Sequence, residues 1–145
     1  MKEAFGERAD LLVDLVEVAS HTSPGRLVSS ELTLAETLVR PIARRDAGLI
    51  QFYEQTLRPG GWLAVEPVSW AVLRDAAEVR ALHGSTKLPD AIHIATALSS
   101  GCVYFLSDDL GLKGEYRLSL GQQSTTVLRP EADTLRALIT ELATS

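Results

Sequence analysis

The feature that most constrains the fold is a regular alternation between short strand-like runs and longer segments with helical periodicity. Four runs have the length and composition of buried strands, at 27–29, 62–65, 102–106 and 125–128. Six segments carry apolar residues at helical spacing, at 5–19, 31–40, 46–57, 69–82, 89–99 and from 130 onward. Strands that alternate with helices form parallel sheets, because a parallel neighbour is reached only through a crossover. The sequence therefore predicts an α/β domain whose parallel sheet of about four strands has helices on both faces.

Local breakers and large side chains refine this prediction. Pro41 is expected to end the helix that begins near Glu31, and Asp46 to begin the next helix, so that the two form a hairpin. Trp62 and Trp70 are expected to pack in the core rather than to stack on bases, because each belongs to an element that needs core residues.

Composition fits one compact domain over residues 1–145, because 46% of the residues are hydrophobic and the single cysteine excludes an internal disulfide. No apolar segment approaches the roughly 20 residues that cross a bilayer, and the charged N-terminus does not resemble a signal sequence. A cytoplasmic protein with no membrane contact is expected. The net charge of −5 gives no broad attraction to nucleic acids, so any nucleic-acid chemistry must rest on local features.

Three acidic positions are predicted to meet at one edge of the sheet. Asp90 lies in the first turn of a helix that begins at the carboxyl edge, and the next strand returns to that edge and ends at Asp108 and Asp109. Glu36 lies in the second turn of another helix that leaves a strand end, and helical side chains lean toward the N-terminus. Glu36, Asp90 and Asp109 should therefore converge.

Clustered carboxylates repel one another, so such a group usually needs a cation, and ligands that are all oxygen select Mg²⁺ or Mn²⁺. A metal of this kind activates water and neutralises charge on a phosphodiester. Each acid alone has an ordinary explanation: Asp90 as a first-turn acid at the helix dipole, Asp109 as a turn residue and Glu36 as a solvated helix acid. Their joint placement favours a metal site for nucleic-acid hydrolysis.

Several other polar residues have two interpretations. A basic cluster could contact an RNA backbone or form a solvated face: Arg40, Arg44 and Arg45. Arg80 continues an apolar helix face, so capping the core or pairing with an acid is favoured over binding a substrate phosphate. His93 lies one turn from Asp90 on the polar side of its helix, which favours a hydrogen-bonding partner over a general base. No histidine and cysteine spacing indicates zinc, and no glycine-rich loop indicates nucleotide binding.

Three segments resemble motifs of the PIN-domain family. They are Val28 to Glu36, Lys87 to Leu98, and Phe105 to Asp109, and the similarity runs from about Gly25 to Arg129. The resemblance implies a three-layer α/β/α fold with Glu36, Asp90 and Asp109 as metal ligands, Ser107 as support for metal or water, and Asp108 as a neighbour. The closest likeness is to VapC-like toxins. It implies an Mg²⁺- or Mn²⁺-dependent endoribonuclease that acts on RNA, forms a homodimer and is inhibited by an antitoxin protein.

The chain departs from this family at its beginning. PIN domains open with a strand that ends in an acidic residue, whereas this sequence opens with a helix, in which Asp10 and Asp14 do not follow an apolar strand. N-terminal truncation is favoured over a natural variant, and a lost core strand would leave unpaired backbone edges that promote partner capture or oligomerisation. The alternative function is a catalytically inactive PIN-like module that binds protein. A small-molecule phosphatase is less favoured, because no nucleophilic aspartate follows an early strand.

Overall fold

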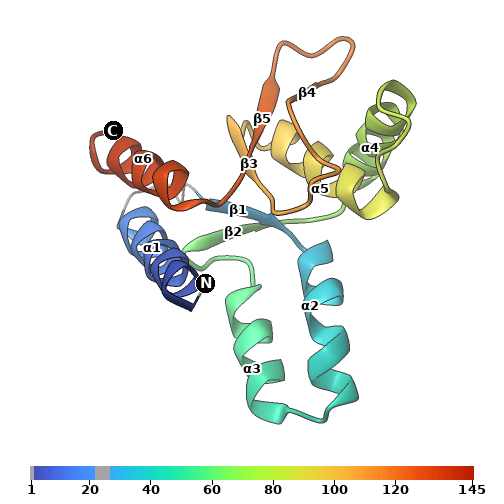
Figure 1. The fold of residues 1–145 in the computed structure, drawn as a ribbon. Coiled ribbons are helices and arrows are strands. Elements are labelled where there is room, and N and C mark those ends of the chain that lie inside the picture. The colour runs from blue at the N-terminus through green and yellow to red at the C-terminus, as the bar shows by residue number, and fades with distance from the viewer. Residues whose placement is uncertain (1, 22–26) are drawn as a thin grey trace.

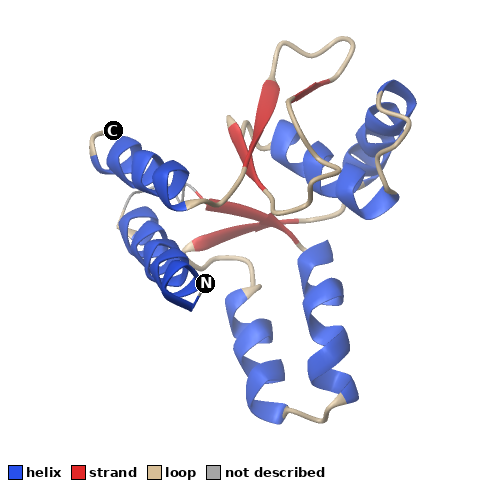
Figure 2. Cartoon of the chain, viewed as in Figure 1, coloured by secondary structure: helices blue, strands red, loops and turns tan. Residues whose placement is uncertain are grey.

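The computed structural model describes residues 2–21 and 27–145. Its helices are α1 (Lys2–Ser20), α2 (Leu32–Ala43), α3 (Ala47–Thr56), α4 (Trp70–Leu82), α5 (Leu88–Ser99) and α6 (Ala132–Ala143). Its strands are β1 (Leu27–Ser30), β2 (Leu63–Glu66), β3 (Tyr104–Leu106), β4 (Glu115–Arg117) and β5 (Ser124–Leu128). The mixture of helices and parallel strand pairs in Figures 1 and 2 confirms the predicted α/β class.

Helices lie on both sides of the strands, and the main core forms beside α5 (Figure 1). Helix α5 packs against α4, and α1 packs against α6 on the other side. Ile94 of α5 and Val79 of α4 are fully buried in this core, which also includes Leu112 and Tyr116 from the chain after β3. Helix α5 therefore holds the first-turn residue Asp90 on a rigid support.

The strands form two separate sheets instead of the single sheet that the sequence predicts. Strands β1 and β2 pair in parallel, with Leu27 opposite Leu63 and Ser30 opposite Glu66. In the second sheet β5 lies between β3, which is parallel to it, and β4, which is antiparallel. Within the described residues, β1 and β3 each have a strand partner on one side only.

Several local features differ from what the sequence predicts. Helix α2 continues through Pro41 and ends at Ala43, since a proline this close to the helix end removes only the bond to the Thr37 carbonyl. Strand β4 was not predicted, because only three residues, with Tyr116 as the buried one, carry its alternating pattern. Trp70 is 79% exposed. It lies about two and a half turns from Val79, on the opposite face of α4.

Trp62 is also outside the core, with 39% of its surface exposed, because it precedes β2 rather than belonging to it. Among the described helices, none is both long and apolar enough to cross a membrane.

Candidate metal-dependent nuclease site

Asp90 stands at the start of α5, where the helix emerges from the core. Lys87 is the residue that precedes the helix, and its carbonyl accepts a hydrogen bond of 2.9 Å from the amide of Ala91. Pro89 occupies the first turn, where its missing N–H has no helical acceptor to lose. Because Ala91 and Ile94 are fully buried, the half-buried Asp90 is fixed at the edge of the core.

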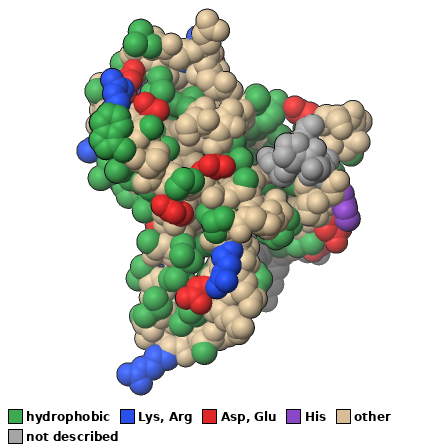
Figure 3. All heavy atoms as spheres, turned by 180° about the vertical axis from the view of Figure 1, so that it is seen from behind, with side chains coloured by type: hydrophobic (Ala, Val, Ile, Leu, Met, Phe, Trp, Pro, Cys, Tyr) green, Lys and Arg blue, Asp and Glu red, His purple; other side chains and the backbone are tan. Residues whose placement is uncertain are grey.

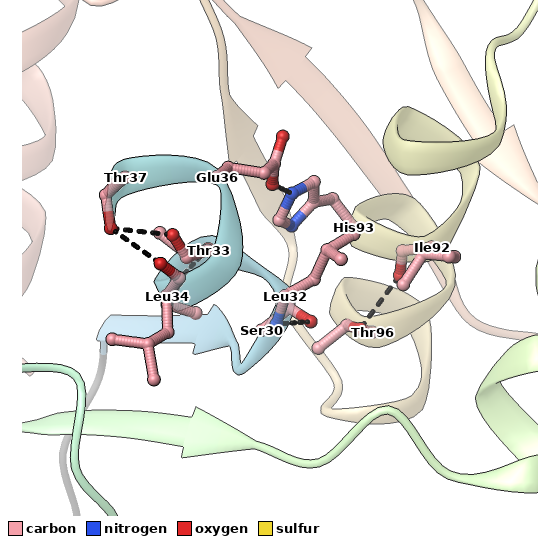
Figure 4. Close-up of polar contacts among 10 residues, drawn as sticks. Ser30, Leu32, Thr33, Leu34, Glu36, Thr37, Ile92, His93 and Thr96 are labelled. Carbon is pink, nitrogen blue, oxygen red and sulfur yellow. Dashed lines mark hydrogen bonds and ion pairs between the residues drawn. The ribbon is translucent and has the colours of Figure 1, made fainter. Parts of the chain in front are cut away.

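Glu36 of α2 reaches across to His93 of α5, and the carboxylate Oε1 forms a hydrogen bond with the imidazole Nε2 (Figure 4). The beginning of α2 is fixed by two further contacts. The Leu32 amide donates to Ser30 Oγ at 3.1 Å, and Ser29 Oγ and Thr33 Oγ1 lie 2.9 Å apart. His93 therefore has the hydrogen-bonding partner that its place on the helix predicts, one turn from Asp90.

Asp109 lies in a tight turn that follows β3. Its amide donates to Ser107 Oγ at 3.1 Å, and its Oδ1 accepts a bond of 2.8 Å from the Gly111 amide. Arg129, directly after β5, donates from Nη1 to the Ser107 carbonyl at 2.8 Å and from Nη2 to the Leu112 carbonyl. The turn that carries Asp109 is thus held from the neighbouring strand.

Asp108 is joined to helix α1. Arg8 Nη2 lies 3.1 Å from Asp108 Oδ2, and Nη1 lies 3.3 Å from Oδ1, which is a two-point ion pair. More than half of the Asp108 side chain is exposed, so the pair adds little stability by itself. Its effect is to anchor the N-terminal helix beside the turn that carries Asp109.

The electrostatics of Asp90 link the three predicted acids. Burial raises the pKa of the Asp90 carboxyl most, and the negative charge of Asp109 raises it further. His93 and Lys87 oppose this rise, and Glu36 adds the smallest upward effect. Carboxylate oxygens at this position are the donors that Mg²⁺ and Mn²⁺ prefer, and a cation would relieve the repulsion. No three His, Cys, Asp or Glu side chains in the described part of the chain stand close enough to hold a metal together.

Replacing Asp109 should lower the Asp90 pKa. Asp109→Asn removes the like charge that contributes most to the raised pKa, so the carboxyl of Asp90 should titrate at lower pH, which carbon-detected NMR of the carboxyl groups measures. Because the folded pKa of Asp90 is raised, the folded state binds more protons than the unfolded state between the two pKa values. The free energy of unfolding therefore falls as pH rises through that window, and the fall should be smaller in the variant. An unchanged Asp90 titration would mean that the two acids do not interact.

The four candidate RNA-contacting arginines are spread over the molecule. Arg40 is exposed one turn beyond Glu36 on α2, whereas Arg44 and Arg45 lie at the tip of the α2–α3 hairpin (Figure 1). Arg80 Nε donates to the Thr86 carbonyl at 3.2 Å and so secures the turn between α4 and α5. Arg40 is therefore the arginine of this group nearest in sequence and helix position to the predicted acids.

Two residues of the site were missed by sequence reasoning. Arg129 could have been found, because it follows the last predicted strand and so falls at the same carboxyl edge as Asp109. Arg8 gave no such signal, since it lies 100 residues from its partner Asp108.

An α/β domain with acidic residues at helix starts and after strand ends is the class of protein that suits metal-dependent phosphodiester hydrolysis. The PIN domain family model matches residues 5–114, more than half of the chain. The chain therefore belongs to the PIN domain family, whose members are typically nucleases that bind divalent metal ions. No curated protein and no solved structure gave a significant match.

Proposed function

We propose that this protein is an Mg²⁺- or Mn²⁺-dependent endoribonuclease, a VapC-like toxin formed by one PIN domain over residues 1–145. The observation that carries the proposal is the PIN domain family match over residues 5–114. The raised pKa of the Asp90 carboxyl, to which the charges of Asp109 and Glu36 contribute, supports the choice of these acids. Asp90 and Asp109 are the proposed primary ligands, with Glu36 as the third acid. The metal, when bound, would activate water and neutralise charge on the phosphodiester.

The protein's own residues would position these acids. His93 holds Glu36 on the side of α5 that carries Asp90, while Arg129 and Ser107 hold the turn of Asp109. Asp108 is proposed as an anchor for α1 through Arg8. We propose RNA as the substrate and the cytoplasm as the location of the protein.

The decisive experiment is an assay of single-stranded and structured RNA with the purified chain in Mg²⁺, Mn²⁺ or EDTA. The proposal expects internal cleavage that requires the metal and stops in EDTA. Cleavage that persists in EDTA would contradict a metal-dependent site, since then the carboxylates would have no ion to hold.

Arg40 provides a test of the RNA contact. Arg40→Gln should weaken RNA binding. It should also reduce the slope of the logarithm of the association constant against the logarithm of salt concentration by about 1, as expected for one lost phosphate contact. Arg74→Gln is the matched control, because Arg74 lies on α4 and is paired with Glu78 at 3.2 Å. Equal effects of the two substitutions on salt dependence would show that only net charge matters.

The α2–α3 hairpin is the proposed surface for a cognate antitoxin or a homodimer. Four large hydrophobic side chains on it are well exposed: Val39, Ile42, Leu49 and Phe52. Figure 3 shows hydrophobic side chains over this projecting hairpin. Exposed apolar clusters of this kind are typical of protein interaction sites.

A second function, a catalytically inactive PIN-like module that binds protein, is favoured by one specific observation. The large hydrophobic side chains exposed on the α2–α3 hairpin fit a binding surface, which this function needs and catalysis does not.

A further inference from the structure

The arginines of the α2–α3 hairpin differ from the other described arginines in the use of their guanidinium groups. Seven arginines in the described part of the chain pair with an acid or donate to a backbone carbonyl: Arg8, Arg58, Arg74, Arg80, Arg117, Arg129 and Arg136. The guanidinium groups of Arg40, Arg44 and Arg45 have no such partner in residues 2–21 and 27–145, and all three residues are exposed. The guanidinium groups that are available for a ligand are therefore gathered on one hairpin.

The end of α2 gives these arginines no role in capping the helix. An arginine in the last turn of a helix often bonds to the final carbonyls. Here the Arg44 amide donates to the Arg40 carbonyl at 2.9 Å. The Arg45 amide donates to the Ile42 carbonyl at 3.1 Å. Backbone amides therefore already satisfy these carbonyls, and the arginine side chains are left to point into solvent.

Arg45 stands in a backbone conformation that favours glycine. Its φ is 55°, and among the described residues it is the one non-glycine residue in the left-handed region. An ordinary side chain strains the backbone there, so glycine would suit this turn better. A charged side chain at a strained, exposed position without a partner in the described protein indicates a role outside folding.

Glu36, Arg40 and Arg44 follow one another along α2 at intervals of four residues. Side chains four residues apart in a helix are neighbours, about 6 Å from each other. Arg44 keeps helical angles, with φ −89° and ψ −2°. The row therefore extends about 12 Å from Glu36. Because Glu36 contacts His93 of α5, the row begins beside the helix that carries Asp90 and leads toward the hairpin tip (Figures 1 and 4).

The exposed apolar side chains of α2 lie on another part of its surface. At about 100° per residue, Arg44 is only about 40° around the helix axis from Arg40. On the same basis Val39 is about 100° away and Ile42 about 160° away. Figure 3 shows basic side chains at the free end of this hairpin, away from the body of the molecule. The arginines can therefore be occupied independently of the surface proposed above for a protein partner.

The ligand that suits this row is a chain of regularly spaced anions. Arginine binds a phosphate through two parallel N–H donors. The step of about 6 Å between successive side chains is close to the separation of neighbouring phosphates along a strand. Proteins that bind single strands without sequence preference use a basic track of this kind. Since the net charge of −5 repels polyanions elsewhere on the chain, a bound strand would be confined to the row.

We propose that Arg40, Arg44 and Arg45 form a track for the backbone of single-stranded RNA, with one phosphate at each arginine. The track leads the substrate strand from the predicted acids to the tip of the α2–α3 hairpin. The inference rests on RNA being the substrate in the proposed function, and it adds the path of the strand outside the site.

The test measures binding of a fluorescent oligouridylate of about ten nucleotides to the whole chain, by anisotropy in EDTA. The variant with Arg40→Gln, Arg44→Gln and Arg45→Gln should bind at least about tenfold more weakly. The slope of the logarithm of the association constant against the logarithm of salt concentration should fall by about 2, since each phosphate contact with a single strand contributes about 0.7.

A charge-matched variant with Arg74→Gln, Arg117→Gln and Arg136→Gln is the control. Each of these arginines pairs with a carboxylate in the structure, and both triple variants remove three positive charges. The control should bind the oligonucleotide more tightly than the variant of the track. Equal losses of binding would show that only net charge matters and would overturn the proposal.

Arg45→Gly separates binding from folding. Glycine relieves the left-handed backbone, which offsets its greater freedom in the unfolded chain, so the melting temperature should stay nearly unchanged. RNA binding should weaken, because the third phosphate contact is lost. Unchanged RNA binding in this variant would overturn the proposed path to the tip.

The track and the nuclease activity can fail separately in these experiments. RNA that binds through the three arginines in EDTA but is not cleaved in Mg²⁺ would contradict the nuclease and support the track. Metal-dependent cleavage with RNA binding that does not depend on the arginines would overturn the track alone. Tighter binding of polyglutamate than of the oligonucleotide, lost in the variant of the track, would assign the arginines to an acidic protein segment and also overturn it.

Discussion

Asp90→Asn is expected to reduce Mg²⁺-dependent RNA cleavage by about 10²–10³-fold while leaving the fold intact. The amide is nearly the same size as the carboxylate, so the packing at the start of α5 should remain. It lacks the negative charge that would hold a divalent ion between Asp90 and Asp109. Cleavage rate and Mg²⁺-induced change in melting temperature should both be measured, because the second does not depend on turnover.

Asp133→Asn is the matched control for this substitution. Asp133 lies in the first turn of α6 just as Asp90 lies in the first turn of α5, and it pairs with Arg136 at 3.2 Å. Both variants lose a first-turn acid at a helix dipole, but only Asp90→Asn should lose the response to Mg²⁺. A full Mg²⁺ response in Asp90→Asn would remove Asp90 from the site.

In EDTA, without bound metal, the melting temperature should change in the opposite direction. Because the folded environment raises the pKa of Asp90, its negative charge destabilises the folded state at neutral pH. Asp90→Asn should therefore have a slightly higher melting temperature than the parent chain in EDTA, whereas Asp133→Asn should not. If Asp90 only stabilised the fold, Asp90→Asn would lower the melting temperature in EDTA instead of raising it.

The fold was predictable where the sequence repeats a pattern over many residues. The helices α1, α4 and α5 and the strands β1, β2, β3 and β5 follow from apolar spacing and from turn residues such as Pro89. Strand β4 and the exposed position of Trp70 were not predictable in this way. The first depends on pairing with β5, and the second on which face of α4 meets α5.

The division of the sheet shows a different limit. Apolar runs indicate that strands exist, but their pairing is a property of the whole chain, and β1 and β3 are joined to different partners. The cavity lined by β1 and β3 could not be predicted either, because it depends on the positions of α1, α5 and α6 around these strands.

For the candidate site, the sequence indicated which acidic residues to consider but not the hydrogen bonds and ion pairs that they form. Asp90 and Asp109 were placed at one edge because strand and helix directions alternate, and their joint role as metal ligands stays a prediction; in the structure the charge of Asp109 contributes to the raised pKa of the Asp90 carboxyl. The bond from Glu36 to His93 was not specified, since His93 had no identified partner in the sequence. The pairing of Asp108 with Arg8 joins distant segments, so only tertiary structure could reveal it.

Ile94→Ala is expected to cost about 2–5 kcal/mol of the free energy of unfolding, because it leaves a cavity in a core that cannot fully close around it. Ile94 has no exposed surface, and seven residues of α5 are buried in the described structure. Chemical denaturation followed by circular dichroism measures the change. A loss of this size is a large part of the stability of a small domain.

Ile42→Ala is the matched control, because Ile42 is 58% exposed on α2 and its truncation should change stability by less than about 0.5 kcal/mol. Equal losses in the two variants would mean that α5 is not the central helix of the core. The comparison also bears on the site, since Asp90 and His93 are both carried by α5. Where Ile94→Ala remains folded, its Mg²⁺ response should persist, because the substitution removes packing below the acids and leaves their charges in place.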